Sequence, residues 1–409
     1  MSLVVVMVTT SYPRFPGDSV GTFMEPIAKS VAARGHRVHI VAPWHPLVRR
    51  PRIEHGLHFH FYKYAPLPSL NVFGYAASMR ADVALKGAAY AAAPLALARG
   101  WWTARTIARR YGASVMHGHW VVPGGVTAAM AAPGLPLVIS VHGSDVYVAE
   151  RIAPVRLAAR RAFRRAGSVT ACSADLATRA IRLGADPERT MVVPYGVDTG
   201  RFAPDRGLRA ERRAQLGVSA SKLLVAAAGR LVSKKGFEYL IDALARLPDA
   251  VLVLDGDGSL REQLQQRAAS SGVRERVRFL GDRTQDDVAA LFSAADVIVA
   301  PSIRDDAGNV DGLPNVVMEA LASGTPLVTT SAGGIGAVVE DTVTALVVGE
   351  RDVEGIASAL TRIRSDAALA ARLGAAARDL VARRFGWDRT AEQFESAYQA
   401  ALALHGRRR

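Results

Sequence analysis

The sequence predicts an α/β protein built from two Rossmann-like halves. With 409 residues the chain is long enough for two or three domains, and 50% hydrophobic content can supply a substantial core. An apolar strand, a glycine-bearing loop and a helix open the chain, and the same order returns near residue 223. Continuous apolar strands of this kind are typical of parallel sheets covered on both faces. Two such halves are therefore expected.

The first half begins with residues 3–9, an apolar run that predicts a buried parallel strand. After a loop, Thr22 to Glu25 has capping-box spacing and opens a helix that is expected to end at Gly35. Residues 36–42 return as a second strand. Because the loop lacks Gly-x-Gly-x-x-Gly, a bound dinucleotide cofactor is not expected.

Histidines mark two later strands of this half. His117 and His119 share one face of a strand, but no third ligand is nearby, so no metal site is expected. Strand 137–141 leads directly into His142. Ligands of open α/β sheets bind beyond the carboxyl ends of the strands, which favours a functional role for His142 over a strand-end histidine bonded to backbone.

The second half repeats the pattern after a polar stretch, 199–221, that we interpret as a linker. Strand 223–228 ends at Gly229-Arg230, and Lys235 precedes a helix with apolar residues at helical spacing. Arg230 leaves the carboxyl end of the strand while Lys235 lies before the helix. Both cations can therefore converge on one anion.

Residues 309–324 carry the strongest functional pattern. Pro314 suits a first helical turn and Gly324 suits the end of the helix, which places Glu319 one turn inside it. Asp311 lies just before the helix start. A free helix N-terminus attracts anions, and two carboxylates beside it can accept hydrogen bonds from sugar or ribose hydroxyls. The combination predicts a ligand with both phosphate and hydroxyl groups, such as a sugar nucleotide.

These motifs resemble those of the retaining glycosyltransferases of family 4. Asp311 to Ala320 is similar to that family's acidic-x7-Glu signature, with Asp in place of the usual Glu, and residues 229–236 resemble its Gly-Arg-Leu-x-x-x-Lys-Gly segment. The resemblance implies the GT-B fold, α/β with two Rossmann-like doubly wound domains facing each other across a cleft. The expected domains are residues 1–198 and 199–385, with a last helix at about 386–405 that packs back on the first.

The resemblance also implies residue roles. Arg230 and Lys235 would hold the donor diphosphate, His142 and Asp311 would position the sugar, and Glu319 would bind the ribose. Weaker acceptor-side candidates are Asp18 and Asp145. The full donor-side set implied by the motifs is Gly21, Leu280, Gly312, Leu313, Pro314, Asn315, Val316 and Glu319.

The implied reaction moves a hexose-type sugar, with retention, from a nucleotide-diphosphate sugar to a glycan or lipid-linked acceptor. No cofactor and no metal would be needed, because the cations and the helix end stabilise the departing diphosphate. Two alternatives remain open. A sugar-nucleotide epimerase shares the GT-B fold, and a metal-dependent transferase would use Asp255 and Asp257, although Asp-Gly-Asp-Gly is also typical of a turn.

The formal net charge of +14 indicates anionic partners. No zinc-finger spacing or interleaved basic and aromatic RNA motif occurs, so nucleic acid is not expected as a partner. Trp101 and Trp102 beside three arginines, and the arginine-rich run 151–165, are interpreted either as solvated helix faces or as peripheral contacts with a membrane surface. A single cysteine, Cys172, suits a reducing cytoplasm.

Overall fold

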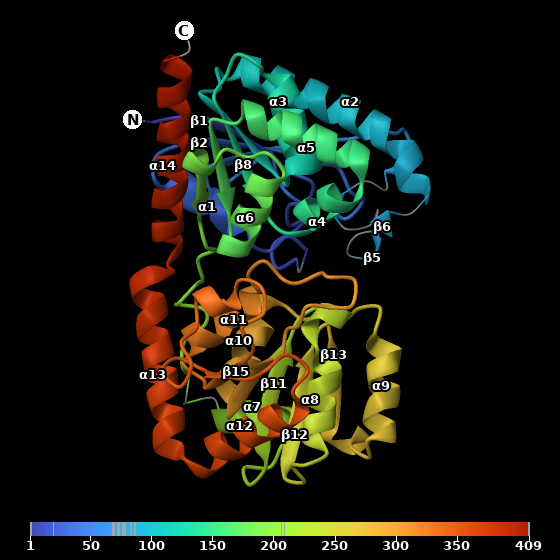
Figure 1. Ribbon diagram of the computed structural model, residues 1–409, viewed down its shortest axis with the longest axis vertical. Coiled ribbons are helices and arrows are strands. Elements are labelled where there is room, and N and C mark those ends of the chain that lie inside the picture. Colours follow the sequence, from blue (N-terminus) through green and yellow to red (C-terminus); the bar gives the residue numbers. More distant parts are fainter. Residues whose placement is uncertain are drawn as a thin grey trace. The chain divides into compact units, whose positions relative to one another are not determined.

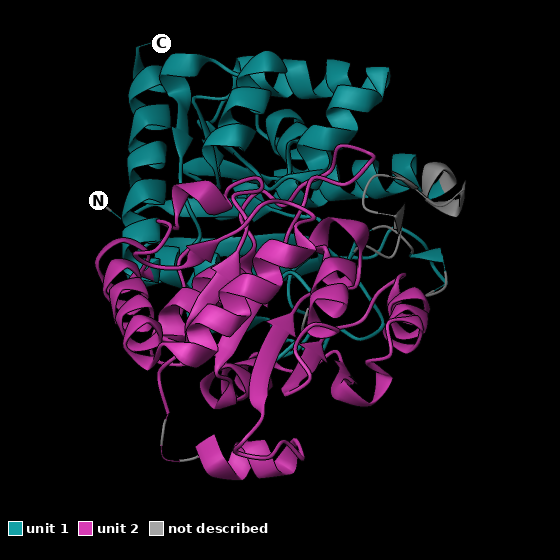
Figure 2. Cartoon of the chain, turned by 60° about the horizontal axis from the view of Figure 1, so that its bottom comes forward, with its two compact units in different colours: residues 1–195, 387–409 teal, residues 196–386 magenta. Residues whose placement is uncertain are grey.

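The computed structural model describes residues 2–407 apart from residues 19, 68–69, 72–73, 76–78, 82–83, 86, 206 and 208. The chain divides into two compact units (Figure 2). Unit 1 comprises residues 1–195 and 387–409, and unit 2 comprises residues 196–386. Each unit contains its own helix-covered sheet (Figure 1).

The sheet of unit 1 has, in the described residues, the order β10-β9-β8-β7-β1-β2-β4-β3. Neighbouring strands are parallel except β3 and β4. A separate antiparallel pair is formed by β5 (Met79–Ala81) and β6 (Ala84–Leu85). The strands of the main sheet are β1 Val4–Val8, β2 Arg37–Pro43, β3 Ile53–Glu54, β4 Leu57–Tyr62, β7 Val115–His119, β8 Leu137–Val141, β9 Ser168–Ala171 and β10 Thr190–Val192.

The helices of unit 1 are α1 Met24–Ala33, α2 Gly87–Arg110, α3 Val126–Ala131, α4 Ser144–Arg151, α5 Ala153–Arg165, α6 Ala174–Arg182 and α14 Trp387–Gly406. The predicted first helix is present, but its predicted capping box is wrong. Phe23 is the N-cap residue of α1, and no side chain caps that end. Glu25 is instead bound by Lys29 at 2.8 Å and by Arg50 at 2.6 Å, so its carboxylate is directed away from the helix start.

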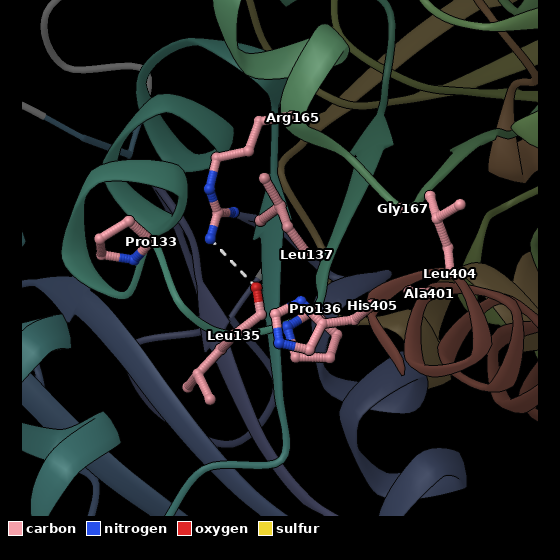
Figure 3. A pocket seen from close by; sticks show the side chains of 9 residues that line it. All are labelled: Pro133, Leu135, Pro136, Leu137, Arg165, Gly167, Ala401, Leu404 and His405. Carbon is pink, nitrogen blue, oxygen red and sulfur yellow. Dashed lines mark hydrogen bonds between the residues drawn. The ribbon is translucent and has the colours of Figure 1, made fainter. Parts of the chain in front are cut away.

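The last helix, α14, packs closely on the sheet of unit 1. A Cβ at Gly167 would lie 2.8 Å from the Cα of Ala401, so glycine is needed for this approach. A cavity of about 60 Å³ lies beside the contact, between Arg165, Pro136 and His405 (Figure 3). It is at the amino ends of β8 and β9, the sheet edge opposite His142, and therefore is not the candidate functional site.

The sheet of unit 2 is parallel, with the order β13-β12-β11-β14-β15-β16 in the described residues. Its strands are β11 Leu223–Ala228, β12 Ala250–Asp255, β13 Val277–Gly281, β14 Val297–Ala300, β15 Leu327–Thr329 and β16 Leu346–Val347. Its helices are α7 Arg209–Gln215, α8 Phe237–Leu244, α9 Arg261–Ser270, α10 Gln285–Ala294, α11 Asn315–Ser323, α12 Val353–Ser365 and α13 Ala367–Arg384.

The stretch 199–221 is not a plain linker, because it contains α7. The helix is anchored by Arg213, which is 6% exposed and lies 2.9 Å from the carboxylate of Asp296. The same guanidinium donates hydrogen bonds to the carbonyls of Ser219 and Lys222. An arginine that satisfies several buried acceptors at once converts a polar segment into packed structure. Composition alone does not reveal such an anchor.

Three histidines gather on β2 and β4 of unit 1. His39 is fully buried, and its ring stacks on that of His58 at 4.6 Å between centroids. His39 Nδ1 and His60 Nε2 are 3.0 Å apart and share a hydrogen bond. Burial, together with neighbouring positive charge, lowers the pKa of His39 and of His60 from 6.5 to about 4. Both rings are therefore neutral at pH 7.

This cluster predicts an acid-sensitive unit 1. Unfolded His39 takes up a proton near pH 6.5 but the folded residue does so only near pH 4, so its contribution to stability is present above pH 6.5 and is lost between these values. At about 1.4 kcal/mol per pH unit the loss is at most about 3.5 kcal/mol. Because Trp44, Trp101, Trp102, Trp120 and Trp387 all belong to unit 1, tryptophan fluorescence during denaturant unfolding measures this unit selectively.

The expected result is a pH slope that is smaller in His39→Asn than in the wild-type protein. His55→Asn is the matched control, since the His55 side chain is 62% exposed. An unchanged slope between pH 6.5 and pH 4 in His39→Asn would contradict the interpretation.

Candidate functional site

The carboxyl edge of the unit 2 sheet holds a compact group of opposite charges. Asp311 lies between two lysines, with Lys235 Nζ 2.6 Å from its Oδ2 and Lys234 Nζ 3.1 Å from its Oδ1. The three side chains are only 11–15% exposed. Burial alone would raise the pKa of Asp311, but the two ammonium groups outweigh it and hold that pKa well below its usual range. Asp311 is therefore a carboxylate at every physiological pH.

Two glycines make room for this group. Gly229, at the end of β11, has a φ of +139°, and a Cβ there would lie 3.3 Å from Lys235 Cε. Gly333 has a φ of +60°, and a Cβ there would lie 2.0 Å from the carbonyl oxygen of Asp311. A side chain at Gly333 would displace the Asp311 backbone. The Gly333-Gly334 turn and the carboxylate before α11 thus form one structural unit.

Helix α11 begins and ends as the sequence predicts. Pro314 is its N-cap residue with no side-chain cap, and Gly324 ends it with a φ of +69°. Glu319 is one turn inside and accepts a hydrogen bond from Gln285 Nε2 at 3.3 Å. Burial raises the pKa of Glu319 to about 7, against the opposing attraction of Lys235 and Arg201. Near neutral pH it can therefore accept or donate a hydrogen bond.

The remaining donor-side candidates lie along the same edge. Gly312, Leu313, Pro314 and Val316 are buried around the start of α11, and Asn315 is half-buried. Arg230 follows β11 and is exposed, while Leu280 is half-buried on β13. Sequence reasoning missed Lys234 and Gln285. The adjacent lysine pair was visible in the sequence, but no sequence signal connects Gln285 to Glu319.

Asp255 and Asp257, the alternative metal ligands, have different surroundings. Asp255 ends β12 and is 6% exposed. Asp257 is exposed and accepts hydrogen bonds from Gly258 N at 2.7 Å and from Arg261 at 3.1 Å. Among the described residues, no group of three or more His, Cys, Asp or Glu side chains is arranged to hold a metal ion.

In unit 1, His142 lies at the carboxyl end of β8 and belongs to a hydrogen-bonded network. Its Nδ1 is 2.6 Å from the hydroxyl of Tyr195, and its Nε2 is 3.1 Å from Nδ1 of His119. The rings of Phe23 and Trp120 pack on it at 4.9 and 4.7 Å between centroids. Burial, reinforced by His119, holds the pKa of His142 well below its usual value. His142 is thus a neutral ring, and both of its nitrogens have protein partners.

The other unit 1 candidates hold loops in place. Asp145 accepts backbone hydrogen bonds from Val121 at 2.7 Å and from Gly143 at 3.0 Å. Asp18 is bound by the guanidinium of Arg14 through two hydrogen bonds of 2.6 and 2.7 Å. These contacts use the oxygens that an acceptor would need, so the structure supports positioning roles for both aspartates.

Gly21 lies in the loop before α1 with a φ of +68°, and a Cβ there would lie 3.1 Å from Ser11 Oγ. This backbone conformation favours glycine. The residue therefore keeps the loop tight between β1 and α1, and its role in donor binding stays a prediction.

Family comparisons match both units of the chain. Residues 20–201 match the family described as Glycosyltransferase Family 4, and residues 209–380 match Glycosyl transferases group 1. The D-inositol 3-phosphate glycosyltransferase of Salinispora tropica is 36% identical over 241 residues, which are 55% of this chain and 48% of the relative.

A GDP-mannose-dependent alpha-(1-6)-phosphatidylinositol monomannoside mannosyltransferase of Mycobacterium tuberculosis is 36% identical over 201 residues, 48% of this chain and 52% of the relative. The chain thus spans about half the length of these curated relatives.

Solved structures resemble the chain over nearly its whole length. HepE of Anabaena in complex with UDP has a TM-score of 0.77 at 23% identity, covering 97% of this chain and 100% of the other. Sucrose-phosphate synthase of Thermosynechococcus elongatus has a TM-score of 0.79 at 22% identity, covering 98% and 100%. These likenesses confirm the expected GT-B fold class.

Proposed function

Because this chain belongs to the family 4 and group 1 glycosyltransferases, we propose that it transfers a hexose-type sugar from a nucleotide-diphosphate sugar to a glycan or lipid-linked acceptor. The observation that carries the proposal is the pair of lysines that bind Asp311 just before the N-terminus of α11. A free helix N-terminus beside two ammonium groups is suited to a diphosphate. The relatives named above are glycosyltransferases, one of them GDP-mannose-dependent.

The chemistry follows from the charges. As the bond between sugar and diphosphate breaks, negative charge grows on the leaving group. Lys234, Lys235 and Arg230 supply positive charge where it grows, and each contact at about 4 Å is worth on the order of 4 kcal/mol at an effective dielectric near 20. Such preorganised charges stabilise the transition state. The proposal therefore requires no metal ion and no cofactor.

Asp311 and Glu319 complete the donor site in this proposal. Asp311 holds both lysines in position before the donor arrives, and the donor phosphate would share these ammonium groups with it. Glu319, supported by Gln285, would bind the ribose hydroxyls. Retention of the anomeric configuration is part of the proposal, with the acceptor attacking on the leaving-group face while Asp311 positions the sugar.

Lys235→Ala and Glu319→Ala are expected to fold but to bind UDP and GDP more weakly. A charge-assisted hydrogen bond contributes about 1.5–3 kcal/mol, so the loss at Lys235 should be roughly 10- to 150-fold in Kd. Isothermal titration calorimetry measures it.

Lys222→Ala is the matched control for these two variants, because Lys222 pairs with Asp249 before β11, far along the strand from Gly229. Unchanged affinity in both site variants would contradict the assignment of the donor site.

Retention is tested by following donor hydrolysis with proton NMR. With GDP-α-D-mannose or UDP-α-D-glucose and water as acceptor, the first free sugar released should be the α anomer, and the rate should not change in EDTA. A β anomer formed first would contradict retention. Loss of activity in EDTA would favour the metal-dependent transferase, and conversion of the donor without sugar release would favour the epimerase.

We also propose peripheral contact with an anionic membrane surface through α2, α3 and α5 of unit 1, which are neighbours (Figure 1). Trp102, Met130 and Leu157 are 56%, 60% and 47% exposed on these helices. Arg160 and Arg164 are exposed on α5. Among the described residues, no helix is long and apolar enough to cross a bilayer. Basic side chains around exposed apolar ones suit an interfacial contact on the cytoplasmic face.

The protein is expected to sediment with phosphatidylglycerol vesicles and much less with phosphatidylcholine vesicles. Arg160→Glu/Arg164→Glu should reduce sedimentation several-fold, because each basic side chain near an anionic surface contributes about 1 kcal/mol. Arg372→Glu/Arg384→Glu, the same charge change on the exposed side of α13, should have little effect. Equal sedimentation of the two double variants would contradict the proposed surface.

A further inference from the structure

Asp255 is a buried carboxyl group that the mechanism above does not use. It is the last residue of β12 and is 6% exposed. In the part of the chain that the structure describes, its Oδ2 has no hydrogen-bond partner. An unsatisfied buried carboxyl oxygen is costly for a folded protein. It therefore calls for a function at this position.

The alternation of β12 fixes the face on which Asp255 lies. Leu252 and Leu254 belong to the hydrophobic cluster beneath α8, α9 and α12. Because successive side chains of a strand point to opposite faces, Val253 and Asp255 lie on the other face. The charged neighbours of Asp255 are consistent with this orientation. Asp287, whose charge helps to raise the pKa of Asp255, belongs to the first turn of α10. Glu319 of α11 is in turn affected by Asp255.

The position along the sheet edge is also defined. Asp255 is in register with Gly281 of β13, and Gly256 N donates a hydrogen bond to Gly281 O at 2.9 Å. Leu280 and Glu319 both belong to the proposed donor site, Glu319 at the ribose. Asp255 is beside the first and within electrostatic reach of the second. If the ribose of a donor is bound at Glu319, the base attached to that ribose would lie next to Asp255.

We propose that the Asp255 carboxylate reads the base of the donor nucleotide and selects guanine, by accepting hydrogen bonds from N1–H and from the N2 amino group. The inference rests on the proposed function, because it assumes a nucleotide donor at this edge. A carboxylate is an acceptor with two oxygens, and guanine presents two adjacent donors to it. Uracil presents one donor between two carbonyl oxygens, which a carboxylate repels.

The surroundings of Asp255 suit this role. Arg283, in the connection between β13 and α10, is the cation that acts on Asp255, and its guanidinium is a donor suited to the neighbouring O6 acceptor of guanine. Burial, with the repulsion of Asp282 and Asp287, raises the pKa of Asp255 to about 7. The empty site therefore readily holds a proton, and guanine binding releases it. The ratio of GDP affinity to UDP affinity should therefore rise with pH through 7. Glu319 titrates in the same range, but it binds the ribose that both nucleotides share, so its titration cancels from the ratio.

The test compares nucleoside diphosphates that differ only in the base, using calorimetry on the full chain. The wild-type protein should bind GDP roughly 10- to 100-fold more tightly than UDP or IDP, since a bidentate base contact discriminates by about 1–3 kcal/mol. IDP lacks only the N2 amino group. Asp255→Asn should lose GDP affinity and gain affinity for XDP, whose N1–H is flanked by a C2 carbonyl that the new amide can serve. Asp257→Asn, exposed and two residues further on, should keep the wild-type preference.

The outcomes separate this inference from the proposed function. If GDP, IDP and UDP bind the wild-type protein equally well, the role of Asp255 is overturned while donor binding stands. If none of them binds, the donor site itself is overturned. The comparison of GDP with IDP needs no variant, so it decides the matter even if Asp255→Asn does not fold.

Discussion

The clamping of one carboxylate between two lysines is the interaction on which the candidate site depends. Asp311 lies within 3.1 Å of Lys234 and Lys235, which come from the turn after β11, whereas Asp311 precedes α11. A charge so little exposed is stable only when paired, and here two opposite charges outweigh its burial. The pairing joins two loops that are far apart in sequence. It also keeps two ammonium groups beside a helix N-terminus without a bound ligand.

Close backbone approach is the second requirement of this edge. Gly229 leaves room for the aliphatic part of Lys235, and Gly333 lets its turn reach the carbonyl of Asp311. Gly236 lies against the carbonyl of Pro301, where a Cβ would be 2.1 Å from the oxygen. Glycine is therefore a steric condition for the charged group to assemble. The three turns converge because parallel strands deliver all their carboxyl ends to one edge.

The sheet of unit 1 carries hydrogen-bonded histidines rather than a group of paired charges. Buried histidines there are held neutral and satisfy one another or nearby hydroxyls, as His117 does with Tyr398 and with Ser140. Tyr398 belongs to α14, so the last helix of the chain completes a network that begins in β7. Such networks order the site only when nearly every member has a partner. His142 takes its fixed orientation from its own hydrogen bonds with Tyr195 and His119.

The sequence by itself determined the parallel strands, the helix that begins near Pro314 and ends at Gly324, and the candidate roles of Lys235 and Asp311. These features rest on local patterns: apolar runs, proline and glycine at helix ends, and motif spacing. Only the tertiary structure decided the partners. It turned Glu25 toward Arg50, anchored α7 through Arg213, occupied both nitrogens of His142 and left Asp255 buried beside Gly281. Ion pairs, burial and pKa values depend on residues far away in the chain, and a single sequence does not record which of these meet.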